Sequence, residues 1–307
     1  MQLPFVDVII PHLNDHERLA RCLELLMAQS YPADSIQVTV VDNGSDKPLT
    51  EVLGRFPRVR ALSEAERGCG TARNRGVAET TGSILAFTDS DCQPDVDWVL
   101  NGVRMLTPGS GVDIIGGRIR VFAKNEAAPT GAELFERVFG FETKRYVERK
   151  HFACGANIMV PRRIFEAVGP FRNGTSPEDF EWGRRATRLG YKIAHGAEVV
   201  IRHPARHTME ELKKKNGRTV WHQRNHMADG EWFRVKWALF TLALASPPLL
   251  KCLQVMRSPD LTDRAQRLAA LKALFAIRYF KAATAVRFLF EPVPAPAPPV
   301  TASRVEA

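Results

Sequence analysis

Residues 83–91 read Ser-Ile-Leu-Ala-Phe-Thr-Asp-Ser-Asp, an apolar run that ends in two carboxylates, Asp89 and Asp91. Such a run is typical of a buried strand, and the polar residues mark the point where the strand gives way to a loop. Two carboxylates at positions i and i+2 suit a hard divalent cation, Mg²⁺ or Mn²⁺, which prefers oxygen ligands and the oxygens of a diphosphate. An isolated Asp-x-Asp is more often a plain turn, so its meaning depends on the surrounding sequence.

The first half of the chain repeats this pattern of a strand followed by a polar loop. Apolar spacing predicts strands and helices in alternation, as a βαβ sheet requires. Ligands bind at the carboxyl ends of the strands in open α/β sheets, so we expect the site at that edge. The predicted strands are 6–10, 37–41, 59–62, 83–87, 113–122, 153–160, 191–194 and 198–202, and the predicted helices are 17–29, 71–80, 131–149 and 178–189.

The composition is that of a globular protein. The 307 residues are 45% hydrophobic and 25% charged, which excludes wholesale disorder, a collagen-like fibre and a coiled coil. Five cysteines without Cys-x-x-Cys spacing suggest neither a zinc ribbon nor a disulfide framework. Because Asp7 interrupts the only early apolar run, no signal peptide is predicted and we expect a cytoplasmic location.

A series of short blocks resembles the family 2 glycosyltransferases of the GT-A fold over most of residues 5–205. The resemblance implies an α/β fold of the GT-A type, with an open, mostly parallel sheet flanked by helices, and an inverting glycosyl transfer. No Gln-x-x-Arg-Trp block of processive polysaccharide synthases is present in the sequence, which favours transfer of a single sugar. The blocks are 8–11 (VIIP), 29–32 (QSYP), 40–45 (VVDNGS), 72–76 (ARNRG), 85–91 (LAFTDSD), 155–157 (GAN) and 169–171 (GPF), followed by Glu178-Asp179.

The resemblance also implies residues that bind the substrates. Asp42 corresponds to the aspartate that accepts a hydrogen bond from the nucleotide base, and Arg73 to an arginine that meets the nucleotide or its phosphates. Asp89 is expected near the ribose or the metal. Pro11 and Asn157 lie in matching blocks and are expected to contact substrate. Two structural alternatives stay open: Asp42 as a turn or helix cap, and Arg73 as a solvated helix charge.

The resemblance implies a metal ligand and a catalytic base as well. Asp91 would be the principal ligand of Mn²⁺ or Mg²⁺, and His203 would approach the same ion. Asp179 matches the base that removes the proton from the acceptor hydroxyl. Glu178 would either raise the proton affinity of Asp179 by like-charge repulsion or bind the acceptor. The alternatives are a helix cap for either carboxylate and a purely structural His203.

The C-terminal third carries the net charge of the chain. Residues 205–290 hold 16 Lys and Arg against 6 Asp and Glu, within a total formal charge of +9. Such a basic region favours an anionic partner, either a phospholipid surface or nucleic acid. No recognisable nucleic-acid reader is present in the sequence, so we predict a membrane surface and no nucleic acid.

Two segments support that expectation. The apolar run from Trp237 to Leu250 is 14 residues long, shorter than the roughly 20 needed to span a bilayer. At about 100° per residue, most cations of 264–290 share an arc away from Leu268 and Leu271, a pattern typical of a basic amphipathic helix in the headgroup plane. These cations are Arg264, Arg267, Arg278 and Lys281. The alternative is that this helix packs against the catalytic body and leaves its cations solvated.

Together these features predict three regions: a catalytic domain over 1–205, a basic helical membrane-associating region over 206–290, and a disordered Pro-rich tail over 291–307. The expected function is glycosyl transfer from a nucleotide-sugar donor to a glycan or lipid-linked acceptor, at the inner face of the cell membrane, for glycan, lipid-linked glycan or cell-surface polysaccharide biosynthesis. A catalytically silent scaffold that acts as a membrane adaptor is the alternative. The retained Asp42, Asp89, Asp91 and Asp179 argue against it, because a scaffold needs none of them.

Overall fold

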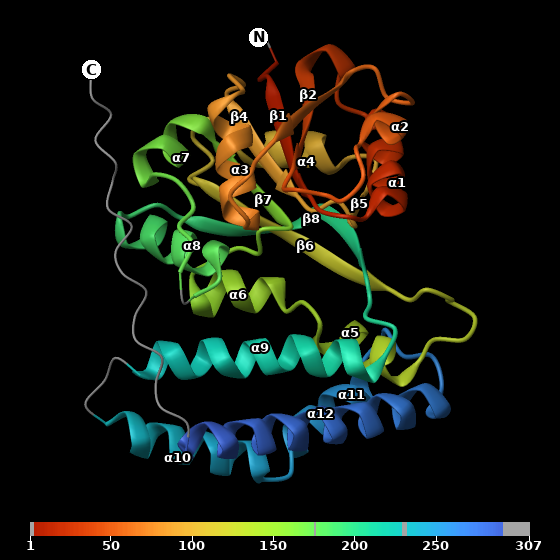
Figure 1. The fold of residues 1–307 in the computed structure, drawn as a ribbon, viewed down its shortest axis with the longest axis vertical. Coiled ribbons are helices and arrows are strands. Elements are labelled where there is room, and N and C mark those ends of the chain that lie inside the picture. Colours follow the sequence, from red (N-terminus) through yellow and green to blue (C-terminus); the bar gives the residue numbers. More distant parts are fainter. Residues whose placement is uncertain (1–2, 175, 229–231, 291–307) are drawn as a thin grey trace.

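One eight-stranded mixed sheet organises the N-terminal two thirds of the chain (Figure 1). The computed structural model describes residues 3–174, 176–228 and 232–290, so the tail predicted over 291–307 lies outside the described residues. The strand order is β3-β2-β1-β4-β7-β6-β8-β5. The pairs β3-β2, β2-β1, β1-β4 and β6-β8 are parallel, and the other three pairs are antiparallel. The strands are β1 (Val6–His12), β2 (Ile36–Asp42), β3 (Val59–Ser63), β4 (Ile84–Thr88), β5 (Gln93–Pro94), β6 (Ile114–Phe122), β7 (Asn157–Pro161) and β8 (Ile193–Pro204).

Helices cover both faces of this sheet, which confirms the predicted α/β class. Because side chains alternate along a strand, Val8 and Ile10 of β1 join the core on one face while Ile9 joins the core on the other. Both faces are buried, and this explains the continuous apolar runs in the sequence. The first face is covered by α1 (His16–Met27), α2 (Thr50–Leu53) and α4 (Trp98–Met105), and the second by α3 (Cys69–Ala78), α7 (Arg162–Val168) and α8 (Glu178–Arg188).

Two stretches are divided into elements differently from the prediction, and the strand predicted over 153–160 begins only at Asn157. The single helix expected over 131–149 is two helices, α5 (Gly131–Phe139) and α6 (Thr143–Lys150), which separate at Gly140. The break lets α6 pack on β6 and β8 while α5 packs on α12 (Arg264–Phe290). The two short strands expected at 191–194 and 198–202 are one strand, β8, whose register with β6 shifts between Gly117 and Arg118. A β-bulge shifts the alternation of side chains within one continuous strand, so the sequence pattern predicts two strands where there is one.

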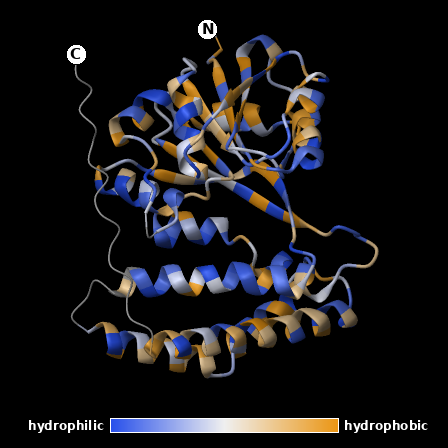
Figure 2. Ribbon diagram, in the orientation of Figure 1, coloured by the Kyte–Doolittle hydropathy of each residue, from blue (hydrophilic) through white to orange (hydrophobic). Residues whose placement is uncertain are grey.

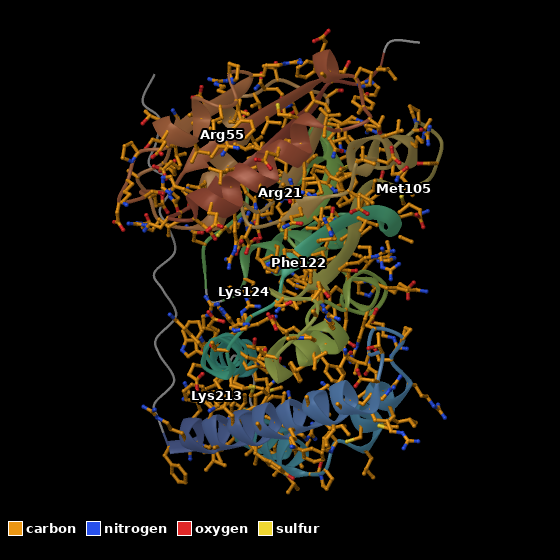
Figure 3. All side chains as sticks on the ribbon, turned by 90° about the vertical axis from the view of Figure 1, so that its right-hand side faces the viewer. Arg21, Arg55, Met105, Phe122, Lys124 and Lys213 are labelled. Atoms are coloured by element: carbon orange, nitrogen blue, oxygen red, sulfur yellow. The ribbon has the colours of Figure 1, made fainter. Side chains whose placement is uncertain are left out.

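A helical layer lies beyond α6, at the end of the molecule opposite the sheet (Figures 1 and 3). It contains α9 (Met209–Ala228), α10 (Phe233–Ala245), α11 (Leu249–Arg257) and α12. Its hydrophobic core includes Leu134 and Phe135 of α5, packed with Leu212 of α9 and Leu274 of α12. The helical layer therefore shares a core with a helix that precedes residue 205, and the division of the chain at 205 stays a prediction.

The outer helices expose an apolar face, which is coloured in orange and tan tones along α10 and α12 in Figure 2. Leu249 is 74% exposed and Leu250 is 84% exposed. A contiguous apolar surface of this kind normally marks a site of interaction. The large exposed apolar side chains of these helices are Val235, Leu239, Leu242, Leu249, Leu250, Leu253, Met256, Leu268, Tyr279, Val286, Leu289 and Phe290.

The predicted orientation of α12 is wrong, because three of the four cations on the predicted arc face the protein: Arg267, Arg278 and Lys281. Arg267 donates to the backbone carbonyls of Met256 and Leu261, and Arg278 donates to the carbonyls of Ser246 and Ala243. Carbonyls near the end of a helix have no partner within the helix and attract cations. The face of α12 that carries Leu268 and Tyr279 is the one exposed to solvent.

Membrane-spanning potential is limited in the part of the chain that the structure describes. No single helix there is long and apolar enough to cross a bilayer. Helices α10 and α11 reach the required length and composition only when they are taken together, and they are bent by 48° at the break between them.

A buried ion pair fixes the edge of the sheet far from the helical layer. Arg162, at the start of α7, donates to the carboxylate of Asp7 in β1 at 3.0 Å and to the carbonyls of Val77 and Gly82. Asp7 is almost fully buried and also accepts the backbone N–H of Gly82. Arg162 therefore joins β1, α3 and the segment before β4.

We expect Arg162→Met to lower the free energy of unfolding by about 3 kcal/mol, because it leaves the buried carboxylate of Asp7 without its cation. The neighbouring Arg163 is exposed, and Arg163→Met should change the free energy by no more than about 0.5 kcal/mol. Urea unfolding followed by circular dichroism measures both values. Equal effects of the two substitutions would show that the Asp7 ion pair contributes nothing specific.

Candidate active site

The carboxyl ends of the central strands bring most of the predicted site residues together (Figure 1). Asp42 is the last residue of β2, and Asp89 and Asp91 directly follow β4. Arg73 reaches the same edge from α3, and Glu178 and Asp179 reach it from the first turn of α8. These residues therefore meet at the edge of the sheet where open α/β proteins bind ligands, between two helices that begin there.

Arg73 connects the two sides of the site. Its guanidinium donates to Asp89 Oδ1 at 2.7 Å and to Glu178 Oε1 at 2.8 Å, and its side chain is only 3% exposed. Gly155 makes this possible, because a Cβ there would lie 2.8 Å from an Arg73 nitrogen. The structure therefore brings Arg73 to the site as a buried partner of two carboxylates, rather than as a cation open to phosphate or a solvated helix charge.

Asp179 lies beside this ion-pair network and is held by the backbone. Its carboxylate accepts the N–H of Gly155 at 2.8 Å and the N–H of Phe180 at 2.7 Å. Burial and the neighbouring charge of Glu178 raise the pKa of Asp179 to about 6, although the two N–H groups and Arg73 oppose the rise. A carboxyl group with this pKa changes protonation near neutral pH, as a general base requires. The predicted effect of Glu178 on Asp179 has the sign that the sequence suggested.

Asp91 and His203 face each other on the other side of Asp89. Asp91 Oδ2 is 3.6 Å from His203 Nε2, and the two groups form a possible ligand cluster with the buried thiol of Cys92. His203 Nδ1 is 2.8 Å from the carbonyl oxygen of Pro204, and Nε2 is the ring nitrogen that faces Asp91. Burial raises the pKa of the Cys92 thiol well above its usual range, so a thiolate ligand is disfavoured.

These donors fit a hard divalent cation. A carboxylate and an imidazole nitrogen would leave the remaining ligand positions to water and diphosphate oxygens, which is how Mg²⁺ and Mn²⁺ are commonly bound next to phosphates. Asp89 is committed to Arg73, which makes Asp91 the stronger candidate of the two aspartates. Burial raises the pKa of Asp91, and the nearby His203 acts in the opposite direction.

Asp42 ends β2 at the same edge of the sheet. Its Oδ1 accepts from the hydroxyl of Ser45 at 2.6 Å and from the backbone N–H of Ser45 at 3.2 Å, so the turn role is present. The half-buried carboxylate leaves Oδ2 for a further donor. His12 pairs with Asp42 in the sheet and is buried, and neither ring nitrogen has a hydrogen-bond partner among the described residues.

Two predicted substrate contacts do not reach the site. Asn157 is 1% exposed, and its amide accepts from Trp98 and donates to the carbonyls of Arg118 and Val199. This side chain joins β7 to β6, β8 and α4, so the substrate-binding role predicted for Asn157 is corrected to a structural one. Pro11 is buried within β1 opposite Val41. The functional residue of the 155–157 block is Gly155, through its contacts with Arg73 and Asp179.

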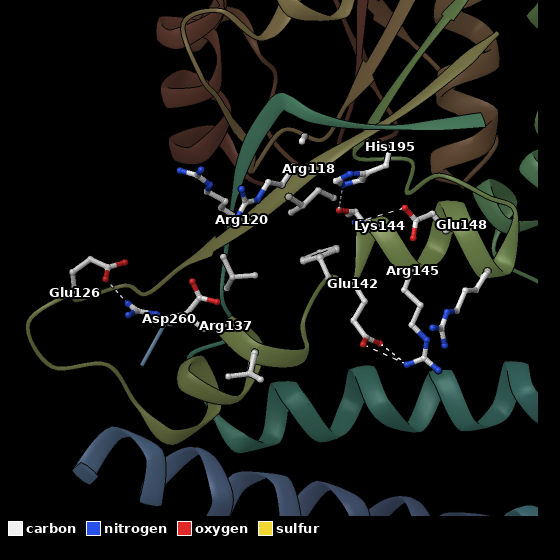
Figure 4. A pocket seen from close by; sticks show the side chains of 17 residues that line it. Arg118, Arg120, Glu126, Arg137, Glu142, Lys144, Arg145, Glu148, His195 and Asp260 are labelled. Carbon is white, nitrogen blue, oxygen red and sulfur yellow. Dashed lines mark hydrogen bonds and ion pairs between the residues drawn. The ribbon is translucent and has the colours of Figure 1, made fainter. Parts of the chain in front are cut away.

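A large polar cavity lies next to the carboxylates rather than on them (Figure 4). It has a volume of about 1190 Å³ and is lined by β6 and β8 on one side and by α5 and α6 on the other. Ion pairs between Arg137 and Glu126 and between Arg145 and Glu142 cross its wall (Figure 4). Phe141 lines the cavity and packs against the ring of His203 at 4.8 Å between centroids, so the cavity begins at the proposed metal ligand.

Known proteins resemble this chain in sequence and in fold. The glycosyltransferase AglE of Haloferax volcanii is 36% identical over 219 residues, which cover 69% of this chain and 71% of AglE. A dolichyl N-acetyl-alpha-D-glucosaminyl phosphate 3-beta-D-2,3-diacetamido-2,3-dideoxy-beta-D-glucuronosyltransferase of Methanococcus voltae is 19% identical over 225 residues, covering 69% of this chain and 70% of that enzyme.

A solved structure shares the fold. The mannosyltransferase PcManGT of Pyrobaculum calidifontis, solved with GDP-Man and Mn²⁺, superposes with a TM-score of 0.61 at 19% identity, over 94% of this chain and 88% of that structure. The family model described as glycosyl transferase family 2 matches residues 7–169, which contain the sheet edge with Asp42, Arg73, Asp89 and Asp91. The chain belongs to the family 2 glycosyltransferases.

Proposed function

We propose that this protein transfers a single sugar, with inversion, from a nucleotide-diphosphate sugar to a hydroxyl of a glycan or lipid-linked acceptor. One observation carries the proposal: the buried Arg73 pairs with both Asp89 and Glu178, and so fixes Asp179, which follows Glu178 and whose pKa is raised to about 6, next to the aspartates that follow β4. The names of the Methanococcus voltae and Pyrobaculum calidifontis proteins support a lipid-linked acceptor and a metal-dependent nucleotide-sugar donor.

In this proposal the donor lies along the ends of β1, β2 and β4. Asp42 accepts a hydrogen bond from the base through its free oxygen. Asp91 and His203 would hold Mn²⁺ or Mg²⁺, which supplies charge neutralisation for the leaving diphosphate when it is bound. Arg73 keeps Asp89 and Glu178 at fixed positions on the two sides of the site.

The acceptor approaches from the side of α8 and the polar cavity of Figure 4. Asp179 receives the proton of the attacking hydroxyl, and a single displacement from the face opposite the diphosphate inverts the anomeric centre. The backbone N–H groups of Gly155 and Phe180 hold the carboxylate in place for this step. A silent scaffold would have no use for an aspartate in this position with a raised pKa.

Asp91→Ala should weaken Mn²⁺-dependent binding of a nucleoside diphosphate by at least about tenfold, because one anionic ligand is lost. Calorimetry with UDP and GDP, with and without Mn²⁺, measures the effect. Asp34→Ala, at a fully exposed side chain, is the control and should bind as the unchanged chain does. Unaltered affinity in a folded Asp91→Ala variant would contradict the assignment of Asp91 to the metal.

Asp179→Asn should leave donor affinity unchanged and lower turnover by about 10² or more, because the amide takes no proton at neutral pH. For the unchanged chain, kcat/KM should rise with pH up to about 6 and then level off, since the base acts only when it is ionised. Glu178→Gln removes the neighbouring negative charge and should move this rise to lower pH. An Asp179→Asn variant with full turnover would place the base elsewhere.

We also propose that the protein acts at the inner face of the cell membrane and is held there by the apolar face of α10, α11 and α12. Exposed cations, among them Arg234, Lys236 and Lys272, lie on the same helices as the exposed leucines, and this mixture suits a headgroup boundary that contains anionic lipid.

Leu250→Glu should reduce binding to vesicles of mixed neutral and anionic lipid by tenfold or more, because a charge replaces an 84% exposed leucine. Vesicle sedimentation at low and high salt measures apolar and electrostatic contributions separately. Thr262→Glu, at an exposed position outside the helices, is the control. If Leu250→Glu binds vesicles as the unchanged chain does, the apolar face does not contact the membrane.

A further inference from the structure

A second cavity, between α6, α9 and the outer helices, gathers positive charge that the proposed transfer reaction does not use. It has a volume of about 420 Å³, and six cations and two carboxylates line it. We call it the lysine pocket. Its cations are Arg145, Lys150, Lys215, Lys251, Arg278 and Lys281, and its carboxylates are Glu136 and Glu142.

The two carboxylates of the lysine pocket already have partners. Glu136 is fully buried and accepts from Lys215 at 2.7 Å and from Arg206 at 2.9 Å. Glu142 pairs with Arg145 at 3.2 Å, and both side chains extend from the start of α6 towards α9 in Figure 4. Neither carboxylate is free to neutralise the remaining cations.

Three lysines remain without an ion pair to any residue that the structure describes. Lys150 lies over the ring of Tyr146 at 5.2 Å, and Lys251 lies over the ring of Phe139 at 5.0 Å. Lys281 is half-buried and lies on the inner side of α12, one turn after the buried Ile277. Cations gathered in a partly dry pocket repel one another unless an anion joins them.

This repulsion lowers the pKa of Lys281. Burial, together with the charges of Lys251, Arg278, Lys150 and Lys215, lowers its pKa to about 8. These cations come from α6, α9, α11 and α12, so every helix that contributes a cation to the pocket acts on Lys281 in the same direction.

The other wall of the lysine pocket is apolar. Phe139, Phe240 and Leu274 line it, and Lys251 directly follows the exposed Leu249 and Leu250 of the outer face. An anion that binds here therefore meets cations at one end and hydrocarbon at the other. This combination fits the phosphate of an amphiphile better than a free inorganic ion.

The lysine pocket also lies close to the proposed base. Tyr146 lines the pocket and stacks on Phe152 at 5.0 Å, and Phe152 contacts the ring of Phe180, the residue after Asp179. The charge of Asp179 contributes to the pKa of Tyr146, which burial raises to about 12. Two aromatic rings thus separate the pocket from the residues that would meet the acceptor hydroxyl.

We propose that the lysine pocket binds the phosphate group of a lipid-phosphate-linked acceptor, with Lys281 and Lys251 as its principal cations and the lipid chain directed over Leu249 and Leu250. This inference rests on the proposed glycosyl transfer, since it names the subsite for the charged link between the lipid and its sugar.

The test measures binding of a short polyprenyl phosphate in neutral detergent micelles to the full chain. Lys281→Met and Lys251→Met should each weaken binding by about tenfold or more, because each removes a charged partner of the phosphate. The matched control is Lys214→Met, at an exposed position of α9 outside the pocket, which should bind within about twofold of the unchanged chain. The corresponding polyprenol, which has the chain without phosphate, should bind at least about tenfold more weakly than the phosphate.

Three results would overturn the proposal that the lysine pocket binds a lipid phosphate. One is equal affinity of Lys281→Met and the unchanged chain for the polyprenyl phosphate, and another is equal binding of phosphate and alcohol. The third is binding of inorganic pyrophosphate as tight as that of the lipid, which would assign the pocket to a soluble anion. Thermal unfolding checks the fold: Lys281→Met should not lower the melting temperature, because it replaces a repelled cation with an apolar chain.

A parallel measurement separates this inference from the proposed function. UDP and GDP binding with Mn²⁺ should be the same in Lys281→Met and in the unchanged chain. If the unchanged chain binds the nucleoside diphosphates but not the polyprenyl phosphate, the proposal for the lysine pocket is overturned and the proposed glycosyl transfer is not. Lipid-phosphate binding in a chain that binds no nucleoside diphosphate would overturn the glycosyl transfer and leave a lipid-phosphate-binding protein.

Discussion

The double ion pair of Arg73 is the constraint on which the rest of the site depends. One buried guanidinium holds Asp89, which follows β4, and Glu178, which begins α8, although these residues are far apart in the chain. A buried arginine of this kind is stable only with both carboxylates in place, because either one alone would leave charge without compensation. The end of the sheet and the start of α8 are thereby fixed relative to each other, and Asp179 takes its position as a consequence. Glycine at 155 is required for the same reason, since any side chain there would occupy the space of the guanidinium.

Much of the sheet follows directly from the sequence, because strands buried on both faces leave continuous apolar runs such as 84–88. The residues at the strand ends, Asp42, Asp89 and Asp91, were predictable for the same reason. Asn157 was not: a polar residue in a matching block resembles a ligand-binding residue in sequence, and only the hydrogen bonds to Trp98, Arg118 and Val199 reveal that it joins strands. Hydrogen bonds between residues distant in the chain leave no local pattern.

The C-terminal helices show a different limit of sequence reasoning. Angular spacing along 264–290 separates cations from apolar side chains, but it does not say which side meets the protein. In the structure Arg267 and Arg278 donate to carbonyls near helix ends, Arg278 and Lys281 line the lysine pocket, and the apolar side is left exposed. The break between α5 and α6 is the related case. A single amphipathic pattern continues through Gly140, but the two halves pack against different partners, one on α12 and the other on β6 and β8.

The exposed leucines of α10 and α11 have a consequence for how the protein behaves in water. Leu242, Leu249 and Leu250 expose hydrocarbon to water, and the hydrophobic effect favours the burial of these side chains against another apolar surface. In the absence of lipid or detergent, the nearest such surface belongs to another molecule of the same chain, so dimers and larger species should accumulate as concentration rises. These assemblies would bury the exposed apolar face of the outer helices. A sample prepared without amphiphiles would then bind nucleotide as usual, while access of a lipid-linked acceptor would be blocked.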